Sequence, residues 1–444
     1  MSQITEIRNE YITYINEHKE EMKRKAEEMK EDLEHSALFV RGRHTSRPLS
    51  IPRIYSKEQI AQFEQIVQTA YGIFCKIIQE YINCEDYRKL FPFPKELEEL
   101  ILVPNGYDSY LPMSRFDIFY NEDSGQFHFC EINADGSTGM NEDRIMDEMM
   151  IHNPAHQEVL RRHNLKPFEL MDSLIDMYLS LYDTYDKKVE KPNIAIVDFL
   201  DLGTVREFEE MVRRFQKRGV NSEICDIREL RYENGKLLSK KGHVIDAVCR
   251  RSVTADVIDH YQEIQPFIQA VKDRAIFIAG SFCTQLVHHK SIFHVIHLPR
   301  TQQFLTKEEI DFVEKHVPKT MPFDPEWIDK EEVIRNKNAW ILKPQDAYAS
   351  RGVAAGFEYG EEEWGKIVSE AYGTHYICQE YVPQYLSSNI DFVFGDGQWH
   401  DYITMAGLYV YNGKFAGVFS RAALDGEIID YINNERRQVT YVLN

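Results

Sequence analysis

The sequence has no surplus of positive charge. It contains 72 Asp and Glu residues against 52 Lys and Arg residues, which gives a formal net charge of −20 over 444 residues. A protein that binds nucleic acid through a general basic surface needs the opposite balance, so this class is excluded. The acidic surplus keeps a protein in solution, and it also suits a cationic partner.

Long apolar runs and closely spaced cysteines are also missing. No window approaches 18 apolar residues and the first 30 residues are highly charged, so we expect neither a membrane span nor a secretory signal. No Cys-x-x-Cys occurs, and the odd number of cysteines disfavours a disulfide framework or a structural zinc site. We therefore expect a soluble protein in a reducing, cytoplasmic compartment. The seven cysteines are Cys75, Cys84, Cys130, Cys225, Cys249, Cys283 and Cys378.

Enough apolar residues are present to build packed cores. Hydrophobic residues make up 43% of the chain, and its length suggests about two to four packed units. The helical spacing of apolar residues predicts one helix over 5–35 and another over 57–81, opened by Ser56. Two runs rich in aromatic and branched residues over 111–134, separated by Asn-Glu-Asp-Ser-Gly, predict a hairpin.

Two later segments alternate strand and helix patterns. The run 193–199 is almost continuously apolar, which is typical of a strand covered on both faces. A helical stretch and further strand patterns follow it, so residues 193–280 predict a partly parallel sheet and an α/β fold. The second segment is a smaller α/β unit over 338–383. Its expected strands are 339–344, 352–359 and 376–382, its helix is 361–372, and further strands follow at 389–396 and 407–421.

Polar side chains gather on one face of the predicted hairpin. Because side chains alternate faces along a strand, Arg115 and Asp117 share a face. With Tyr120 paired to Gln126 across the turn, Arg115 lies opposite Glu131, and Asp117 lies diagonal to it. The two sets that we expect to share a face are Arg115, Asp117 and Phe119 on the first strand and Phe129, Glu131 and Asn133 on the second.

This polar face favours a metal site. Burying two carboxylates beside a carboxamide is costly unless a cation neutralises them. Mg²⁺ prefers carboxylate and amide oxygens and often keeps phosphate oxygens as further ligands. Arg115 would add a planar fork for a phosphate. The alternative interpretation is an exposed hairpin with an ordinary surface salt bridge, and the hairpin alone does not decide between the two.

Two features of the second α/β unit fit a nucleotide. Lys343 ends an apolar strand and precedes the polar loop Gln345–Arg351, which is followed by Gly352. Its ammonium group could reach one phosphate of a nucleotide, while backbone N–H groups of the loop cover the remaining phosphates. The segment Gln379–Val382 could offer backbone groups to an adenine and the Glu380 carboxylate to a ribose or an exocyclic amine. Taken singly, neither feature is specific: lysines at strand ends are common and the loop has only one glycine, and Gln379–Val382 alone is more typical of a core strand.

Together these motifs resemble the ATP-grasp ligases. The matching motifs are Arg115-x-Asp117, Glu131-x-Asn133, Lys343-Pro344 with its loop, and the segment Gln379–Val382. In the usual ATP-grasp order the lysine lobe comes first, whereas here Glu131 precedes Lys343 by 212 positions. This is the order of the circularly permuted group that includes glutathionylspermidine synthetase. The resemblance covers roughly residues 40–425.

The resemblance implies a role for each site residue. It gives Asp117, Glu131 and Asn133 as Mg²⁺ ligands, and Arg115, Ser137 and Thr138 as the residues around the γ-phosphate and the acyl group. For the nucleotide it gives Lys290, Lys343, Gly352, Gln379, Glu380 and Val382. Arg251 and Arg421 become substrate-binding candidates.

The resemblance also implies a fold, a reaction and partners. It implies an ATP-grasp fold in permuted order: a mostly helical region 1–100, the metal strands and following helices 101–190, a Rossmann-like pre-ATP-grasp unit 191–290, and the nucleotide lobe with C-terminal strands 291–444. The expected activity is an ATP- and Mg²⁺-dependent ligase that joins a small-molecule or peptide carboxylate to an amine through an acyl phosphate. We expect no nucleic-acid or membrane partner. The alternatives are a non-catalytic nucleotide-binding regulator and a kinase on the same scaffold.

The loop Gln345–Arg351 is polar and lacks apolar periodicity, so we expect it to open readily in the free protein and to close over bound nucleotide. Trypsin should then cut early after Arg351 in the free protein, and Mg²⁺ with a non-hydrolysable ATP analogue should protect this bond. Digestion followed by mass spectrometry measures the effect. Equal cleavage with and without nucleotide, at concentrations where binding is seen independently, would contradict a closing loop.

Overall fold

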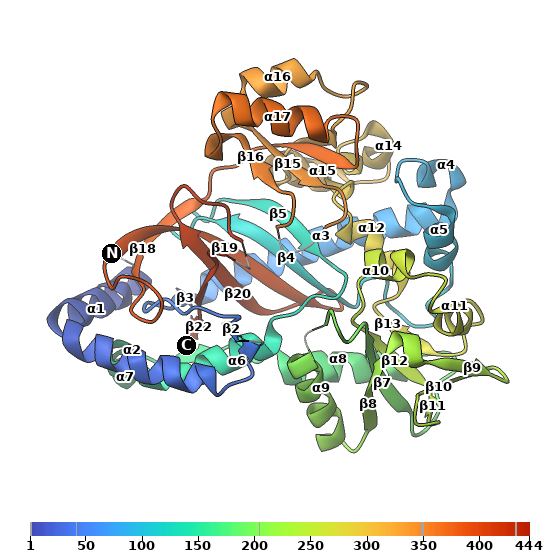
Figure 1. The fold of residues 1–444 in the computed structure, drawn as a ribbon, viewed down its shortest axis with the longest axis horizontal. Coiled ribbons are helices and arrows are strands. Elements are labelled where there is room, and N and C mark those ends of the chain that lie inside the picture. The colour runs from blue at the N-terminus through green and yellow to red at the C-terminus, as the bar shows by residue number, and fades with distance from the viewer. Residues whose placement is uncertain (1, 41, 204, 348–349, 431–432) are drawn as a thin grey trace.

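The computed structural model describes residues 2–40, 42–203, 205–347, 350–430 and 433–444. Three parts meet at its centre: an antiparallel sheet, a parallel sheet below it on the right of Figure 1, and a small lobe above it. The N-terminal helices extend to the left of the central sheet. None of the helices in the described part of the chain combines the length and the apolar character that a membrane span requires.

The central sheet is antiparallel, with strand order β21-β20-β19-β4-β5, and β18 pairs with the first half of β19. The long helix α3 packs on it, and its apolar stripe, which includes Phe63 and Phe74, is buried against the sheet. Ser56 and Gln59 form a capping box, so the predicted second helix and its start are confirmed. The bounds are β4 Met113–Tyr120, β5 Phe127–Asn133, β18 Tyr385–Ile390, β19 Trp399–Tyr411, β20 Lys414–Leu424, β21 Arg436–Gln438 and α3 Lys57–Asn83.

The predicted hairpin β4–β5 is present, but its predicted register is wrong. Tyr120 pairs with Phe127 rather than with Gln126, and a bulge lies between the pairs Ile118–Phe129 and Asp117–Glu131. The bulge leaves one residue of β5 unpaired and turns Phe129 to the apolar core, away from the face that carries Glu131. Arg115 therefore lies opposite Asn133, and Asp117 lies directly opposite Glu131.

The predicted parallel sheet is confirmed, with strand order β13-β12-β7-β8. The helix α9 connects β7 to β8 and packs against β8. A hairpin turn at Asn234 and Gly235, both with positive φ, joins β9 to β10 as expected. The bounds are β7 Asn193–Asp198, α9 Val205–Lys217, β8 Asn221–Asp226, β9 Arg231–Glu233, β10 Lys236–Leu238, β11 Val244–Ile245, β12 Ala247–Arg250, α10 Thr254–Asp259, α11 Gln265–Lys272 and β13 Phe277–Ala279.

The upper lobe is a small antiparallel sheet, ordered β14-β17-β15-β16, covered by α16 and α17. Two expectations are corrected here. The strand expected over 352–359 shrinks to β16 because a 3-10 turn, Gly356–Glu358, follows at once, and β17 ends at Glu380 rather than at Val382. The bounds are β14 Thr320–Pro322, α16 Lys330–Arg335, β15 Trp340–Pro344, β16 Ala354–Ala355, α17 Glu361–Ala371 and β17 Tyr376–Glu380.

The N-terminal segment forms two helices instead of the single helix expected over 5–35. The helices α1, Gln3–Glu17, and α2, Lys19–Glu34, are separated at His18, whose φ of −127° lies outside the helical region. Both helices bury an apolar stripe and contact α7, Pro154–Arg162. A straight helix could not bring both stripes onto the same support, so the break follows from tertiary packing.

Short elements tie the ends of the chain together. The strand β22 pairs with β3 and β6, which joins the C-terminus to two earlier segments. The strand expected over 389–396 is displaced, because β18 ends at Ile390 and Asp391 then caps a turn. The remaining elements are β1 Phe39–Val40, β2 Arg43–His44, β3 Arg53–Tyr55, α4 Glu85–Arg88, α5 Lys95–Ile101, α6 Met140–Met149, β6 Leu165–Pro167, α8 Met171–Asp183, α12 Gln285–His288, α13 Ile292–Val295, α14 Pro299–Gln302, α15 Lys307–His316 and β22 Thr440–Leu443.

A buried carboxyl in α6 makes stability depend on pH. Burial raises the pKa of Asp143 to about 7; Arg437 opposes the shift, and Asp147 and Glu142 add to it. The folded protein therefore keeps a proton that the unfolded chain releases above about pH 4, so this group lowers stability as pH rises from about 4 to 7. We expect Asp143→Asn to melt at least about 2 °C higher than the natural protein at pH 8, with a smaller difference at pH 5. Melting curves at both values test this, and a variant that is equally destabilised at both would contradict it.

Candidate functional site

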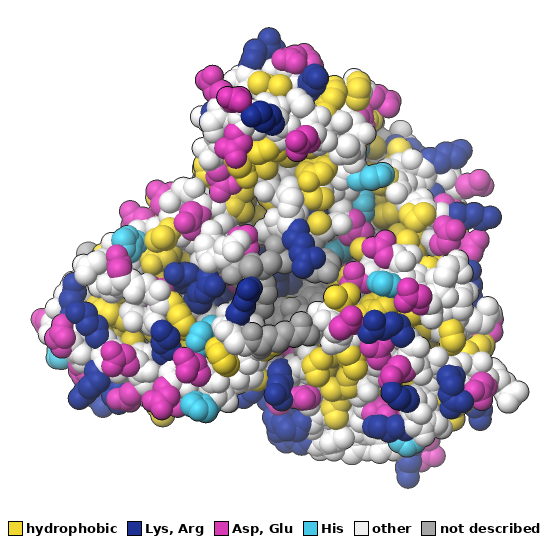
Figure 2. Space-filling model, in the orientation of Figure 1, with side chains coloured by type: hydrophobic (Ala, Val, Ile, Leu, Met, Phe, Trp, Pro, Cys, Tyr) yellow, Lys and Arg dark blue, Asp and Glu magenta, His cyan; other side chains and the backbone are white. Residues whose placement is uncertain are grey.

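Two cavities share one wall at the centre of the molecule. The inner pocket lies between the upper lobe and the central sheet and has about 760 Å³ of empty space, including its mouth. The outer cleft lies between the central sheet and the parallel sheet and has about 1370 Å³. Glu131 and Arg421 line both cavities. Figure 2 shows Lys and Arg side chains around the centre of this face, where the three parts meet.

A buried ionic network surrounds Asp117 in the shared wall. Asp117 is completely buried, and its Oδ1 accepts a hydrogen bond from Arg115 Nε at 2.7 Å. Its Oδ2 accepts from Arg115 at 3.0 Å, from Asn133 Nδ2 at 2.9 Å and from Arg421. Burial alone would lower the pKa of Arg115, but the neighbouring Asp117 carboxylate raises it well above its usual value. The Asp117 carboxylate therefore orients two guanidinium groups toward the cavities.

Glu131 is the carboxylate that faces both cavities. Its side chain keeps 31% of its surface exposed, and its Oε1 accepts from Asn133 Nδ2 at 3.0 Å. Burial alone would raise the pKa of Glu131, but Lys290, Arg421 and Lys343, with the hydrogen bond from Asn133, hold it well below its usual range. Glu131 is therefore an ionised carboxylate surrounded by cations from three distant parts of the chain.

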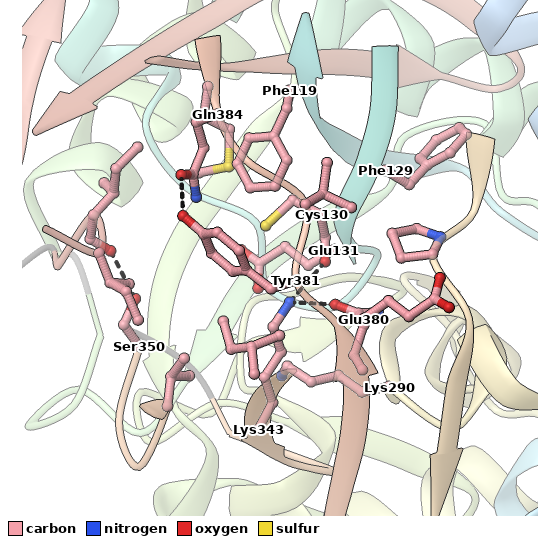
Figure 3. Close-up of a pocket in the computed structure, with 18 of the residues that line it drawn as sticks. Phe119, Phe129, Cys130, Glu131, Lys290, Lys343, Ser350, Glu380, Tyr381 and Gln384 are labelled. Carbon is pink, nitrogen blue, oxygen red and sulfur yellow. Dashed lines mark hydrogen bonds between the residues drawn. The ribbon is translucent and has the colours of Figure 1, made fainter. Parts of the chain in front are cut away.

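The two expected lysines both line the inner pocket. Lys343, on β15, donates to the Cys130 carbonyl at 3.2 Å and to Gln379 Oε1 at 2.8 Å. Lys290 follows α12 and donates to the Ala347 carbonyl at 2.8 Å. Figure 3 shows both amines on the side of the pocket away from Phe119. The structure thus brings Lys343 and Glu131 to one cavity.

Gln379 sits behind Lys343. It is buried, and its Nε2 donates to the Thr320 hydroxyl at 2.8 Å while its Oε1 accepts from Lys343. Both ends of the amide are therefore engaged within the protein. Although Gln379 also lines the pocket, its contacts position Lys343.

The segment after β17 forms another wall of the inner pocket. The Glu380 side chain is exposed, and its backbone N–H donates to the Lys319 carbonyl at 2.9 Å. The N–H of Tyr381 is likewise bonded, to Ala339, whereas that of Val382 has no acceptor among the described residues. Val382 therefore offers a free donor beside apolar wall residues. These apolar residues are Phe119, Ile341, Val353, Met405, Ile428 and Ile429.

The outer cleft contains the predicted acyl-group residues. Ser137 Oγ donates to the Asn133 carbonyl at 2.7 Å, and the Thr138 carbonyl accepts from Arg115 at 3.1 Å. Arg251 is buried, donates to the Ser137 carbonyl and lies 3.3 Å from Glu207. In this arrangement Arg251 braces the turn after β5.

The predicted phosphate loop is described only in part. Tyr348 and Ala349 lie outside the described residues, so the expected closure of this loop stays a prediction. Ser350 Oγ donates to the Ile429 carbonyl at 2.9 Å, which ties the end of the loop to the segment after β20. Gly352 has φ +71°, and an added Cβ there would lie 2.8 Å from the Tyr376 hydroxyl. This position therefore needs glycine.

Sequence reasoning missed three supporting residues. Glu207, on α9, accepts the N–H groups of Gly139 and Asn141 at 3.0 and 3.2 Å and so fixes the start of α6. Tyr409, on β19, donates to the Thr138 carbonyl at 2.7 Å, and Glu435 is a buried carboxylate beside Arg421. Glu207 and Glu435 lie in charged stretches that resemble solvent-facing surface, so no local signal identifies them.

Gly407, on β19, makes room for the Arg115–Asp117 pair. An added Cβ would lie 2.7 Å from both Arg115 Cδ and Asp117 Oδ1. We expect Gly407→Ala to shift Arg115 and to lower the ATP-dependent activity expected from the sequence at least about tenfold, because a small displacement of groups at a reaction centre is costly. Gly365→Ala, at an open position of α17, is the matched control. Steady-state rates of both folded variants test this, and natural turnover in Gly407→Ala would contradict it.

A metal site here would need the Asn133 amide. Among the described residues, no three His, Cys, Asp or Glu side chains are grouped so that they could hold a metal ion. Asp117 and Glu131 would supply two carboxylates, and Asn133, whose Nδ2 now donates to both of them, would add a neutral oxygen once its amide turns over. These are the oxygen donors that Mg²⁺ prefers.

The structure is a mixed α/β fold, consistent with that of the ATP-grasp-related synthetases. Its fold is that of a glutathione synthetase-like effector from Globodera pallida, with a TM-score of 0.62 and 13% identity over 95% of this chain and 96% of that one. A gamma-glutamylcysteine synthetase described as putative, from Methylobacillus flagellatus, aligns with a TM-score of 0.44 and 10% identity over 86% of this chain and 87% of that one. No curated protein sequence matches the chain.

The chain belongs to the glutathionylspermidine synthase preATP-grasp family. The model of this family matches residues 21–297, which include the hairpin β4–β5, the parallel sheet and Lys290. The resemblance to glutathionylspermidine synthetase inferred from the sequence motifs is thereby confirmed.

Proposed function

We propose that this protein is an ATP-dependent carboxylate–amine ligase that forms an amide through an acyl phosphate. The observation that carries the proposal is the wall shared by the two cavities, where Glu131, Arg421 and the Asp117 network meet. A reaction between a nucleotide and a second substrate needs such a junction, because the phosphoryl group must pass from one to the other. Membership of the synthase family supports this assignment.

The inner pocket fits ATP. Its apolar wall and the free N–H of Val382 suit an adenine, and the exposed carboxylate of Glu380 suits a ribose or an exocyclic amine. Lys290 and Lys343 would contact the phosphates, with Gly352 allowing the tight turn of the loop. Gln379 acts through Lys343. Both lysines are more than nine-tenths buried, so their charges are poorly screened and attract a polyphosphate strongly.

The shared wall fits Mg²⁺. Glu131 lines both cavities and would offer a carboxylate oxygen. Asn133 directs its Nδ2 at Asp117 and Glu131, so its amide would have to turn over to offer Oδ1, and Asp117 can join them only when Arg421 releases its Oδ2. When bound, the metal would neutralise the charge of the phosphates. Arg115 and Arg421 would contact the transferred phosphoryl group, and cationic groups fixed in advance stabilise the charge that develops there.

The outer cleft would hold the carboxylate and the amine. Ser137 and Thr138 lie directly after the metal strand and would bind the acyl group, with Arg251 bracing their backbone. Closure of the loop Gln345–Arg351 over the bound substrates would keep water from the acyl phosphate. We assign the four regions 1–100, 101–190, 191–290 and 291–444 to the roles expected from the sequence, in the permuted order in which Glu131 precedes Lys343.

An ADP-release screen tests the proposal. The purified protein with Mg²⁺ and ATP is assayed against carboxylates (amino acids, short peptides and glutathione) in pairs with amines that include polyamines, and products are identified by mass spectrometry. A ligase releases ADP and phosphate and yields an amide that needs both partners. A phosphorylated product that needs only one partner would identify a kinase, and nucleotide binding without turnover in any pair would favour the regulatory alternative.

A further inference from the structure

Three charged atoms around Glu435 are buried without a hydrogen-bond partner. They are Glu435 Oε2, Arg421 Nε and Arg437 Nη1, each unpartnered among the described residues. Glu435 lies between the two arginines, 3.7 Å from Arg421 and 3.6 Å from Arg437. Both distances exceed those of hydrogen bonds. Because a buried charged atom without a partner is costly, this arrangement points to a second state in which Glu435 is bonded.

Arg421 is the side chain that can supply this bond. Its Nη2 donates to Asp117 Oδ2 and lies 3.6 Å from Glu131 Oε1, while its Nη1 faces Glu435. A shift of about one ångström would bring Nη1 within hydrogen-bond distance of Glu435. Arg437 cannot leave as easily, because it also lies 3.4 Å from Glu142 and stacks over Phe419.

The position that Arg421 occupies is the one that a metal would need. Asp117 Oδ2 already accepts three hydrogen bonds, from Arg115, Asn133 and Arg421. Arg115 is bound to both carboxylate oxygens, and Asn133 is fixed on the neighbouring strand. Of the three donors, Arg421 is the one that has a further carboxylate, Glu435, beside it to move to. A divalent cation at Asp117 and Glu131 would also repel its guanidinium.

We propose that Glu435 is a positioning residue that receives the Arg421 guanidinium when a divalent cation and nucleotide take over Asp117 and Glu131. Arg421 then neutralises the metal site in the free protein and turns toward the phosphoryl group in the loaded one. Glu435, which lines the outer cleft, holds Arg421 against the wall of that cleft instead of releasing its side chain into the open space. The inference rests on the proposed function, because it assumes that this site takes a metal with a nucleotide.

Mn²⁺ is the probe, and its free concentration is measured by electron paramagnetic resonance with and without a non-hydrolysable ATP analogue. We expect Glu435→Gln to weaken Mn²⁺ binding about tenfold, because the displaced Arg421 loses its second partner. Arg421→Met should tighten binding of Mn²⁺ alone about threefold, because nothing then competes for Asp117. When Arg421 is already replaced by Met, Glu435→Gln should leave Mn²⁺ affinity unchanged. Such non-additivity shows that the two residues are coupled.

Two further variants control for a purely structural role. Glu435→Asp keeps the charge and should bind Mn²⁺ within about threefold of the natural protein. Glu142→Gln removes the other carboxylate beside Arg437, which does not touch Arg421, and should leave Mn²⁺ affinity unchanged. Melting curves without ligand show which variants fold.

The outcomes separate the inference from the proposed function. Unchanged Mn²⁺ affinity in folded Glu435→Gln, or the same loss with and without Arg421, overturns the role of Glu435 while leaving the ligase proposal intact. Absence of Mn²⁺-dependent binding of the ATP analogue to the natural protein overturns the proposed function and the inference together.

Discussion

Replacing Glu131 by Gln should lower ADP release at least about a hundredfold while the protein stays folded. The amide has nearly the shape of the carboxylate, so β5 and its pairing with β4 should persist. The change removes the ionised group that Lys290, Lys343 and Arg421 surround and that faces both cavities. Losing one such electrostatic contact in a catalytic site typically costs two to three orders of magnitude in rate.

The measurement compares Glu131→Gln with Asp123→Asn under one assay. Asp123 is an exposed carboxylate in the turn of the same hairpin, so its loss controls for a general effect of removing negative charge. Circular dichroism and melting curves establish folding, and Mg²⁺-dependent binding of a non-hydrolysable ATP analogue gives a second readout. ADP release at nearly the natural rate in folded Glu131→Gln would refute the metal-site assignment.

Replacing Lys343 by Met should lower kcat/KM for ATP about 10- to 100-fold. The methionine keeps the apolar stem of the side chain but loses the ammonium group, and a hydrogen bond to a charged group contributes about 1.5–3 kcal/mol. Because Lys343 enters the inner pocket beside Lys290, we expect a raised KM for ATP in addition to a lower kcat. Lys366→Met, on the exposed face of α17, is the control.

Gln379→Leu tests the orientation of Lys343 separately from its charge. It leaves the charge of Lys343 but removes the acceptor at 2.8 Å that orients it. The expected loss in kcat/KM is therefore smaller than for Lys343→Met. Initial rates over a range of ATP concentrations separate the two variants, and an equal or larger effect of Gln379→Leu would contradict a purely positioning role.

The local elements of the site could be predicted because they depend on short-range patterns. Alternation along a strand places Arg115 and Asp117 on one face whatever the rest of the chain does, and the apolar run 193–199 predicts a covered strand. The register could not be predicted, because a bulge beside Cys130 is decided by how Phe129 fills the core. The break at His18 has the same kind of cause, since it depends on the helix that supports both halves.

The sequence by itself determined the chemical groups of the site and their order along the chain: Arg-x-Asp and Glu-x-Asn on one hairpin, and a lysine at the end of a later strand. Only the tertiary structure decided how they combine. Lys343 reaches the Cys130 carbonyl, beside Glu131, from 213 positions away, and Arg421 on β20 and Glu435 directly before β21 complete the wall. The reason is physical: periodicity reports which face a residue occupies, whereas the charge that faces it across a cavity depends on packing between distant elements.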